Sequence, residues 1–236
     1  MTSRALISVL IPAYNAAPYL AEAIESALGQ THQPVEVIVV DDGSEDGTEA
    51  VARAYGDRIF FERLEHRGIG SARNRAVELS HGDYLAFLDA DDRFLPTKLE
   101  HQLAALESDS ELDIVFGFIH EFISPDVPPE TQATMRRPAP SSPWTGPNVM
   151  LIRREAFDRV GAFSTDFRVG EGIDWYARAA EAGLKSLMLR EVVLERRLHG
   201  QNSSVREPQS RSDYLQVVRS AVERRRARDA GSSEAT

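Results

Sequence analysis

The chain has 236 residues, 42% of them hydrophobic, a formal net charge of −10 and no cysteine. This length and apolar content are typical of one globular domain with a sizeable core. The acidic balance argues against general nucleic-acid binding, and the lack of cysteine excludes disulfides, thiolate chemistry and zinc sites built on sulfur. A net negative protein that handles anionic ligands needs local positive charge, from a metal ion or from arginines placed at the site.

The N-terminal residues run directly into a strand-like segment, without the apolar core and small-residue cleavage site of a signal peptide. No apolar run approaches the ~20 residues that span a bilayer, so we expect no transmembrane segment. The sequence therefore predicts a cytoplasmic protein. An arginine-rich helix predicted at 211–228 adds peripheral attachment to the inner face of the membrane as an alternative location.

The first half of the chain alternates between short apolar runs and helical patterns. Strands are expected at 6–11, 35–40, 59–61 and 84–88, with Pro12 ending the first of them. Helices are expected at 20–28, 46–55, 72–80 and 96–107. Nearly continuous apolar strands that alternate with helices indicate an α/β fold with a mostly parallel sheet flanked by helices.

The second half is less regular. Strands are expected at 113–123, 148–153 and 187–198, and helices at 154–160, 173–182 and 211–228. The segment 124–147 is rich in Pro, Ser and Thr and shows no periodicity, so it is predicted to be a loop.

Three of the predicted strands end in polar segments, at 12–15, 41–44 and 89–92. In open parallel sheets ligands bind beyond the carboxyl ends of the strands, so three such ends on one edge indicate a ligand crevice. If the fourth strand continues far enough, Asp89 and Asp91 share one face and can hold a hard divalent cation with coordination sites left for phosphates. An isolated Asp-x-Asp is more often a solvated turn, and the converging strand ends favour the metal site.

Asp41 and Asp42 carry adjacent carboxylates, which repel each other unless something binds them. One can cap the turn, and the other can accept hydrogen bonds from a sugar hydroxyl or a base N–H. The segment 70–74 places amides and the Arg73 guanidinium at a predicted helix N-terminus, which suits an anion, with a solubilising surface arginine as an equal alternative. Neither a dinucleotide fingerprint nor a Gly-x-x-x-x-Gly-Lys phosphate loop is present.

Two carboxylates, Glu171 and Asp174, stand at the start of a predicted helix. They can act as acid–base groups, or they can simply stabilise the helix N-terminus. His199 follows two arginines at a predicted strand end. A histidine is more often structural, but beside a carboxylate metal site it can supply a further ligand or contact a diphosphate.

Together these segments resemble the inverting family-two glycosyltransferases, which have the GT-A fold. The matching segments are 9–15, 39–44, 46–48, 72–74 and 87–92, followed by looser matches at 161–163, 174–175 and 199–203. The N-terminal motifs are specific in this order and spacing, although none of them is specific alone.

The resemblance implies a nucleotide-diphosphate-sugar donor, an acceptor hydroxyl and Mg²⁺ or Mn²⁺ as cofactor. Pro12, Tyr14 and Asp42 would contact the base and ribose, with Asn15 and Asp41 near them.

The remaining donor-side roles fall on the later motifs. Arg73 would lie by the base or the diphosphate, and Asp89 by the ribose or the sugar. Asp91 would bind the metal ion, with His199 as the other predicted metal ligand.

The domain organisation follows from this resemblance. We expect one GT-A-like catalytic domain over 1–205, with a nucleotide-sugar-binding half (1–110) and an acceptor-side half (111–205), followed by a C-terminal helix and tail over 206–236.

One departure concerns the catalytic base. Many relatives have Glu-Asp where this chain has Glu171 and Gly172, and the Asp is the usual base. We expect Glu171 to take this role, with Asp174 as the alternative.

Two other functions stay open, a weakly active or non-catalytic nucleotide-sugar-binding module and a sugar-1-phosphate nucleotidylyltransferase. The second would need a glycine-rich loop with Arg and Lys after the first strand, and the segment 12–17 lacks one.

The acceptor is a glycan, a lipid-linked sugar, a natural product or a peptide, and it is expected to be selected by residues 124–175. No nucleic-acid partner is expected. A homodimer formed through the C-terminal helix is a further prediction.

Overall fold

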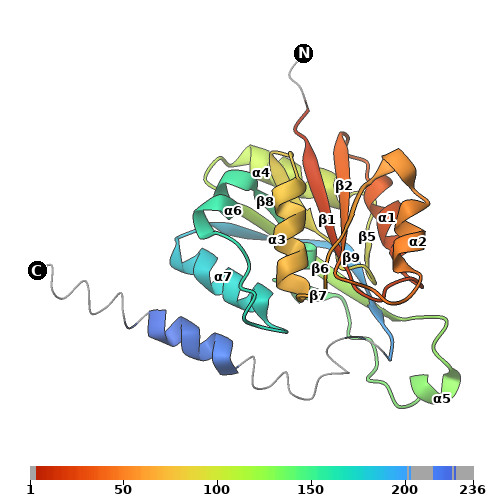
Figure 1. Cartoon of the computed structure of the whole chain (residues 1–236). Coiled ribbons are helices and arrows are strands. Elements are labelled where there is room, and N and C mark those ends of the chain that lie inside the picture. Colours follow the sequence, from red (N-terminus) through yellow and green to blue (C-terminus); the bar gives the residue numbers. More distant parts are fainter. Residues whose placement is uncertain (1–3, 201, 203–214, 225, 227–236) are drawn as a thin grey trace, which may run out of the picture.

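The computed structural model of the chain describes residues 4–200, 202, 215–224 and 226. Figure 1 shows a central sheet with helices packed around it. Within these residues nine strands form a single sheet. None of the helices described combines the length and the hydropathy that a bilayer crossing requires.

The first half of the chain forms the parallel part of the sheet, in the order β3-β2-β1-β4. The four strands are β1 (Ile7–Ala13), β2 (Val35–Asp41), β3 (Phe60–Arg63) and β4 (Tyr84–Phe87). β1 is buried along its whole length, as expected for a strand covered on both faces. The predicted α/β architecture is therefore confirmed.

β1 does not end at Pro12, as the sequence predicts, but continues through it to Ala13. The reason lies in the pairing. The carbonyl of Leu10 accepts the amide of Leu88, so alternate residues of β1 face β4, and the β1–β4 pairing ends at Leu10. Pro12 faces the same side, two residues beyond Leu10, where β1 no longer pairs with β4. Its missing N–H therefore removes no hydrogen bond from the sheet.

The second half extends the sheet with strands of both directions. They are β5 (Arg93–Phe94), β6 (Ile114–Ile123), β7 (Ser142–Trp144), β8 (Leu151–Arg153) and β9 (Ser186–Leu198). β8 pairs antiparallel with β4 and joins the two halves, β6 is antiparallel to β8, and β9 is parallel to β6. β5 and β7, which the sequence does not predict, add short antiparallel pairings to β9 and β6.

The helices pack against the sheet. The α-helices of the domain are α1 (Leu20–Leu28), α2 (Thr48–Arg53), α3 (Ile69–Leu79), α4 (Lys98–Ser108), α5 (Pro129–Gln132), α6 (Arg154–Val160) and α7 (Glu171–Glu181). Two 3₁₀ turns, η1 (Gly56–Arg58) and η2 (Pro147–Val149), complete them. α3 packs against β1 and β2, whereas α4 packs against β6 and β9.

Several predicted boundaries change. α7 begins at Glu171, two residues earlier than predicted, after Gly170 in a left-handed conformation (φ 92°) that a side chain would strain. The predicted loop 124–147 contains α5 and β7. Of the predicted helix 211–228, the described residues 215–224 are helical, and 211–214, 225, 227 and 228 lie outside the described residues, as does the tail.

An aromatic cluster fixes α6 and α7 against β4. Phe87 of β4 meets Phe163 edge-on with ring centroids 5.3 Å apart, and Phe157 stacks on Trp175 at the same distance. The indole N–H of Trp175 donates to the carbonyl of Gly161 at 2.8 Å. Trp175 is thus a core residue, and its packing sets the position of the first turn of α7.

Candidate active site

The three polar strand ends meet, as predicted, at one edge of the sheet. Ala13 at the end of β1 is in register with Asp41 at the end of β2, and Leu10 is in register with Phe87 of β4. The carboxyl ends of these parallel strands therefore present their following loops side by side.

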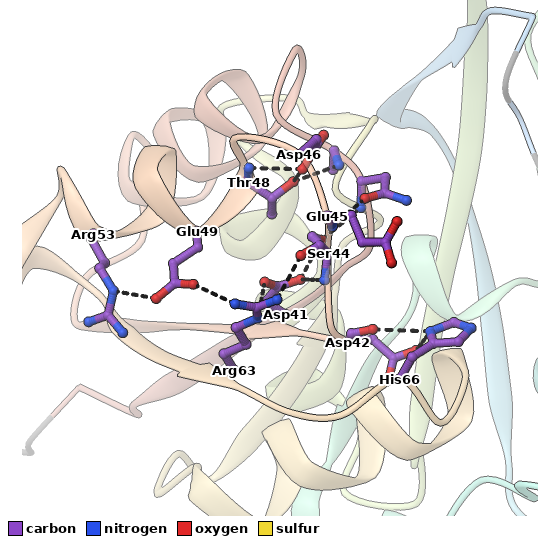
Figure 2. Close-up of polar contacts among 12 residues, drawn as sticks. Asp41, Asp42, Ser44, Glu45, Asp46, Thr48, Glu49, Arg53, Arg63 and His66 are labelled. Carbon is purple, nitrogen blue, oxygen red and sulfur yellow. Dashed lines mark hydrogen bonds and ion pairs between the residues drawn. The ribbon is translucent and has the colours of Figure 1, made fainter.

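Asp41 organises the turn after β2. Its buried carboxylate accepts hydrogen bonds from the amide of Ser44 at 3.0 Å and from the Ser44 hydroxyl, and Arg63 lies 3.7 Å away (Figure 2). The Ser44 hydroxyl in turn accepts the amide of Asn15 at 2.8 Å. The Asn15 side chain accepts the amide of Glu45 at 2.9 Å, and Asn15 itself has a positive φ of 49°. Asp41 and Asn15, through these hydrogen bonds, thus hold the ends of β1 and β2 together.

Asp42 anchors the loop that follows β3. Its carboxylate accepts the amides of Arg67 and Gly68 at 2.9 and 2.8 Å, and Nδ1 of His66 lies 2.8 Å from it (Figure 2). His66 stacks on Tyr14 with ring centroids 4.3 Å apart, and Tyr14 remains 48% exposed. The two rings form an accessible aromatic face beside Asp42. His66 is absent from the sequence-based predictions, since only the folded loop brings it to Tyr14.

A buried arginine connects two predicted site carboxylates. The Nη2 of Arg73 donates to Asp89 at 2.7 Å, and its Nη1 pairs with Glu171. Burial opposes the charge on the guanidinium, but the two carboxylates outweigh it and raise the pKa of Arg73. Burial also raises the pKa of Asp89, in spite of Arg73.

The expectation that Asp89 and Asp91 share one face of a strand is corrected. β4 ends at Phe87, and a turn follows in which the amide of Asp92 donates to the carbonyl of Asp89. Asp91 therefore faces a different partner, Nε2 of His199 at 3.0 Å, and accepts a further hydrogen bond from Asn202 at 3.2 Å.

Asp92 plays a structural part. It is buried and accepts the amide of Arg197 at 2.9 Å and the side-chain amide of Asn148 at 3.1 Å. Burial, with the charges of Asp91 and Asp89, raises the pKa of Asp92 well above its usual range. These bonds connect the turn to β9 and η2.

The donor set at Asp91 suits a hard divalent cation. A carboxylate oxygen and an imidazole nitrogen lie together, and the Asp91 side chain is 29% exposed. Among the residues that the structure describes, no three His, Asp or Glu side chains gather closely enough to hold a metal by themselves. Substrate oxygens and water can supply the remaining ligands, which is the usual pattern for Mg²⁺ at phosphates.

The two carboxylates of α7 have different surroundings. Asp174 is buried between Arg178 and Arg224, each with a nitrogen 2.9 Å from it. Asp174 is therefore a structural ion-pair partner of two arginines rather than a helix cap. Glu171 is buried as well, and its partner is Arg73.

The position after Glu171 cannot accept a side chain in this packing. A Cβ on Gly172 would lie 2.7 and 2.8 Å from the ring carbons of Pro147. The close approach of η2 to α7 therefore leaves no room at position 172 for the aspartate of the family motif.

Comparisons with known proteins agree with this arrangement. A family model described as glycosyl transferase family 2 matches residues 8–167. An uncharacterised glycosyltransferase of Rickettsia typhi is 43% identical over 118 residues, which cover 50% of this chain and 37% of that protein. The chain therefore belongs to glycosyl transferase family 2, and it spans well under half the length of this curated relative.

Solved structures show the same fold. TarS of S. aureus (residues 1–349, in complex with UDP) has a TM-score of 0.69 at 20% identity and matches 91% of this chain and 64% of its own. The mannosyltransferase PcManGT from Pyrobaculum calidifontis, in complex with GDP-Man and Mn²⁺, has a TM-score of 0.70 at 20% identity, covering 94% of this chain and 65% of its own. The expected GT-A fold is confirmed.

Proposed function

We propose that the chain is a metal-dependent inverting glycosyltransferase that moves a sugar from a nucleotide-diphosphate donor to an acceptor hydroxyl. The observation that carries the proposal is the ion-paired group Asp89–Arg73–Glu171, which joins a donor-side strand end to the first turn of α7. This group supports the proposal because it links the carboxylate of the candidate base, Glu171, through one side chain to Asp89 on the proposed donor side.

The donor contacts are proposed at the ends of β1 and β2. Tyr14 and His66 offer an exposed aromatic face for a base, and Asp42 borders it through its contact with His66. Pro12, two residues before Tyr14, is proposed as a further contact. TarS was solved with UDP and with UDP-GlcNAc, and PcManGT with GDP-Man, which supports a nucleotide sugar as the class of donor.

Asp91 and His199 are the proposed metal-binding residues, since they offer adjacent oxygen and nitrogen donors. The Mn²⁺ in PcManGT supports the same cofactor class. When bound, Mg²⁺ or Mn²⁺ neutralises the negative charge that develops on the departing nucleoside diphosphate.

Glu171 is the proposed base, because Gly172 carries no side chain and Asp174 is held by two arginines. Its carboxylate would accept the proton of the acceptor hydroxyl as that oxygen bonds to the anomeric carbon. An attack on the face opposite the leaving diphosphate inverts the configuration of that carbon in a single displacement, which requires one base and no covalent nucleophile.

The test is a transfer assay with labelled nucleotide sugars, a panel of acceptor hydroxyls, and Mn²⁺ or EDTA. We expect turnover that EDTA abolishes, and a product whose anomeric configuration, measured by NMR, is opposite to that of the donor. Glu171→Gln should lower kcat by about 10²–10⁴-fold. Glu155→Gln, at an exposed position of α6, is the matched control and should retain wild-type kcat.

A product with the donor's configuration would contradict inversion, and full activity in Glu171→Gln would contradict the base. Asp174→Asn should mainly lower the free energy of unfolding, because two arginines lose their charged partner.

A nucleotide-sugar-binding module without catalysis is the second candidate, favoured by one observation: both candidate bases are ion-paired. Saturable binding of nucleotide sugars with neither transfer nor donor hydrolysis, at any tested acceptor, would support it. The family membership offers no support for a nucleotidylyltransferase.

A further inference from the structure

Arg73 joins three segments that are far apart in the sequence. It lies on α3, its Nη2 reaches Asp89 after β4, and its Nη1 reaches Glu171, 98 positions along the chain. Figure 1 shows the lower end of α3 beside the first turn of α7. The guanidinium also stands 5.6 Å above the ring centroid of Phe163. Both terminal nitrogens of this side chain, and one face of its guanidinium, thus contact protein groups.

The burial of this group distinguishes it from a surface ion pair. The Arg73 side chain is 3% exposed, and its partners Glu171 and Asp89 are 8% and 30% exposed. A buried charge of this kind is tolerated only when its partners are well placed, and removing one partner leaves an uncompensated charge behind. The geometry of the three groups is therefore mutually dependent.

Arg75, two positions further along α3, provides the contrast. It pairs with Glu62 at 2.8 Å and Glu78 at 2.9 Å, and its side chain is 37% exposed. Such exposed pairs contribute little to stability. The two arginines share a helix and each pairs with two carboxylates, but only Arg73 touches predicted site residues.

We propose that Arg73 is a positioning residue that holds the Glu171 carboxylate beside the donor-side Asp89, and that it acts on transfer through Glu171. This inference rests on the proposed function. It differs from the role implied by the family resemblance, in which Arg73 contacts the donor itself. The planar guanidinium suits this task because its two terminal nitrogens serve two carboxylates at once, which the single ammonium of a lysine does less well.

The consequence is a separation of kinetic effects. If Arg73 orients the base, its loss displaces Glu171 and lowers kcat, because misplacement by about 1 Å costs on the order of 100-fold in rate. The donor KM should stay near the wild-type value. A direct donor contact would give the reverse pattern, with a raised donor KM.

The experiment compares Arg73→Met, Arg73→Lys, Glu171→Gln, the double variant Arg73→Met/Glu171→Gln, and Arg75→Met as the matched control. We expect kcat to fall about 100-fold in Arg73→Met, to recover in part in Arg73→Lys, and to be unchanged in Arg75→Met. In the double variant kcat should be no lower than in Glu171→Gln alone, because groups that act as a unit are not additive.

Hydrogen exchange provides a readout that does not depend on turnover. The amide of Asp174 donates to the carbonyl of Gly170, which closes the first turn of α7. Exchange of the amides of residues 171–175 should accelerate in Arg73→Met and Arg73→Lys and not in Arg75→Met. Thermal unfolding of each variant shows which of them are folded.

Three results would each overturn the inference: a raised donor KM at unchanged kcat in Arg73→Met or Arg73→Lys, losses that multiply in the double variant, or unchanged exchange in α7. If the wild-type chain transfers no sugar, the proposed function fails, and the exchange data alone decide whether Arg73 positions Glu171.

Discussion

At the scale of single residues, three neighbouring carboxylates have three different environments. Asp89 faces Arg73, Asp91 faces His199, and Asp92 is buried against backbone and amide groups. Three residues of the same type therefore have three different roles: Asp89 forms an ion pair, Asp91 is a candidate metal ligand, and Asp92 is a structural anchor. Burial and partner, rather than residue type, decide what each carboxylate can do.

Lys98 is a buried lysine away from the site. Its side chain is fully buried, donates to Gln102 at 2.6 Å, and lies 4.4 Å from the ring centroid of Phe94. Burial lowers the pKa of Lys98 well below its ordinary value. The unfolded chain therefore binds a proton more strongly at this group than the folded chain does, and the group favours folding more as the pH rises.

Lys98→Met removes this dependence. The effect is confined to the pH range between the lowered pKa of Lys98 in the folded chain and its pKa of ~10.4 in the unfolded chain. In this range, each pH unit of acidification should lower the free energy of unfolding of the wild type, relative to that of Lys98→Met, by up to about 1.4 kcal/mol. Denaturant unfolding of both proteins from pH 6 to 10 measures this difference. Lys185→Met, at an exposed lysine, should not show it, and parallel pH profiles for Lys98→Met and wild type would refute it.

Some of the site residues predicted from sequence, such as Asp41 and Asp91, follow strands. They are predictable because a buried strand and its end are both visible in a local pattern. Which of the predicted site residues pair with one another was not predictable. Arg73 and Glu171 are 98 positions apart, and their contact depends on how α7 packs on β4 through Trp175 and Phe163. A single sequence holds no local record of such a contact.

At the scale of secondary structure elements, segments with a hydrophobic pattern of their own were predictable, including the short β3 and β8, whereas β5 and β7 were not. β1, β2 and α6 carry their own hydrophobic pattern. β5 has two residues and β7 has three, and both exist only because a longer strand lies alongside. These two strands form only through pairing with a neighbouring strand, so their own sequences do not predict them.

The contact between α7 and η2 leads to a prediction for Gly172. Gly172→Asp should not restore a better base, because its Cβ would overlap the ring of Pro147. We expect a loss of about 1–3 kcal/mol in the free energy of unfolding, the usual cost of overpacking. Pro147→Ala in the same chain should recover part of it, since the overlapping ring carbons are gone.

Denaturant unfolding of Gly172→Asp, Pro147→Ala and the double variant gives the coupling between the two positions. Additive effects would show that Pro147 does not oppose a side chain at position 172.

At the scale of the whole molecule, the described C-terminal helix is joined to α7. Arg224 reaches Asp174 at 2.9 Å and Glu181 at 3.1 Å, and Val217 is buried, whereas Leu215, Val218 and Val222 are exposed. The inward face of this helix therefore packs on its own chain. A homodimer formed through this helix stays a prediction. The face available for such a contact is the one that carries the exposed Leu215, Val218 and Val222.

Arg224→Met should loosen this attachment. Asp174 would keep only Arg178, and we expect the free energy of unfolding to fall by about 1–3 kcal/mol, together with faster proteolysis of residues 215–224. Arg219→Met, at an exposed position of the same helix, is the control and should behave as wild type. Equal behaviour of the two variants would show that the Arg224 contacts do not hold the helix.

The pairing of β4 with β8 has a mechanical consequence. Because it places the predicted donor and acceptor halves in one continuous sheet, they cannot swing apart as two rigid bodies around a hinge. If residues 124–175 select the acceptor, as predicted, adjustment to a new acceptor falls above all to the segment 124–147, which pairs with β6 through β7. We predict that exchange of this segment between family members alters the choice of acceptor and leaves the rest of the sheet unchanged.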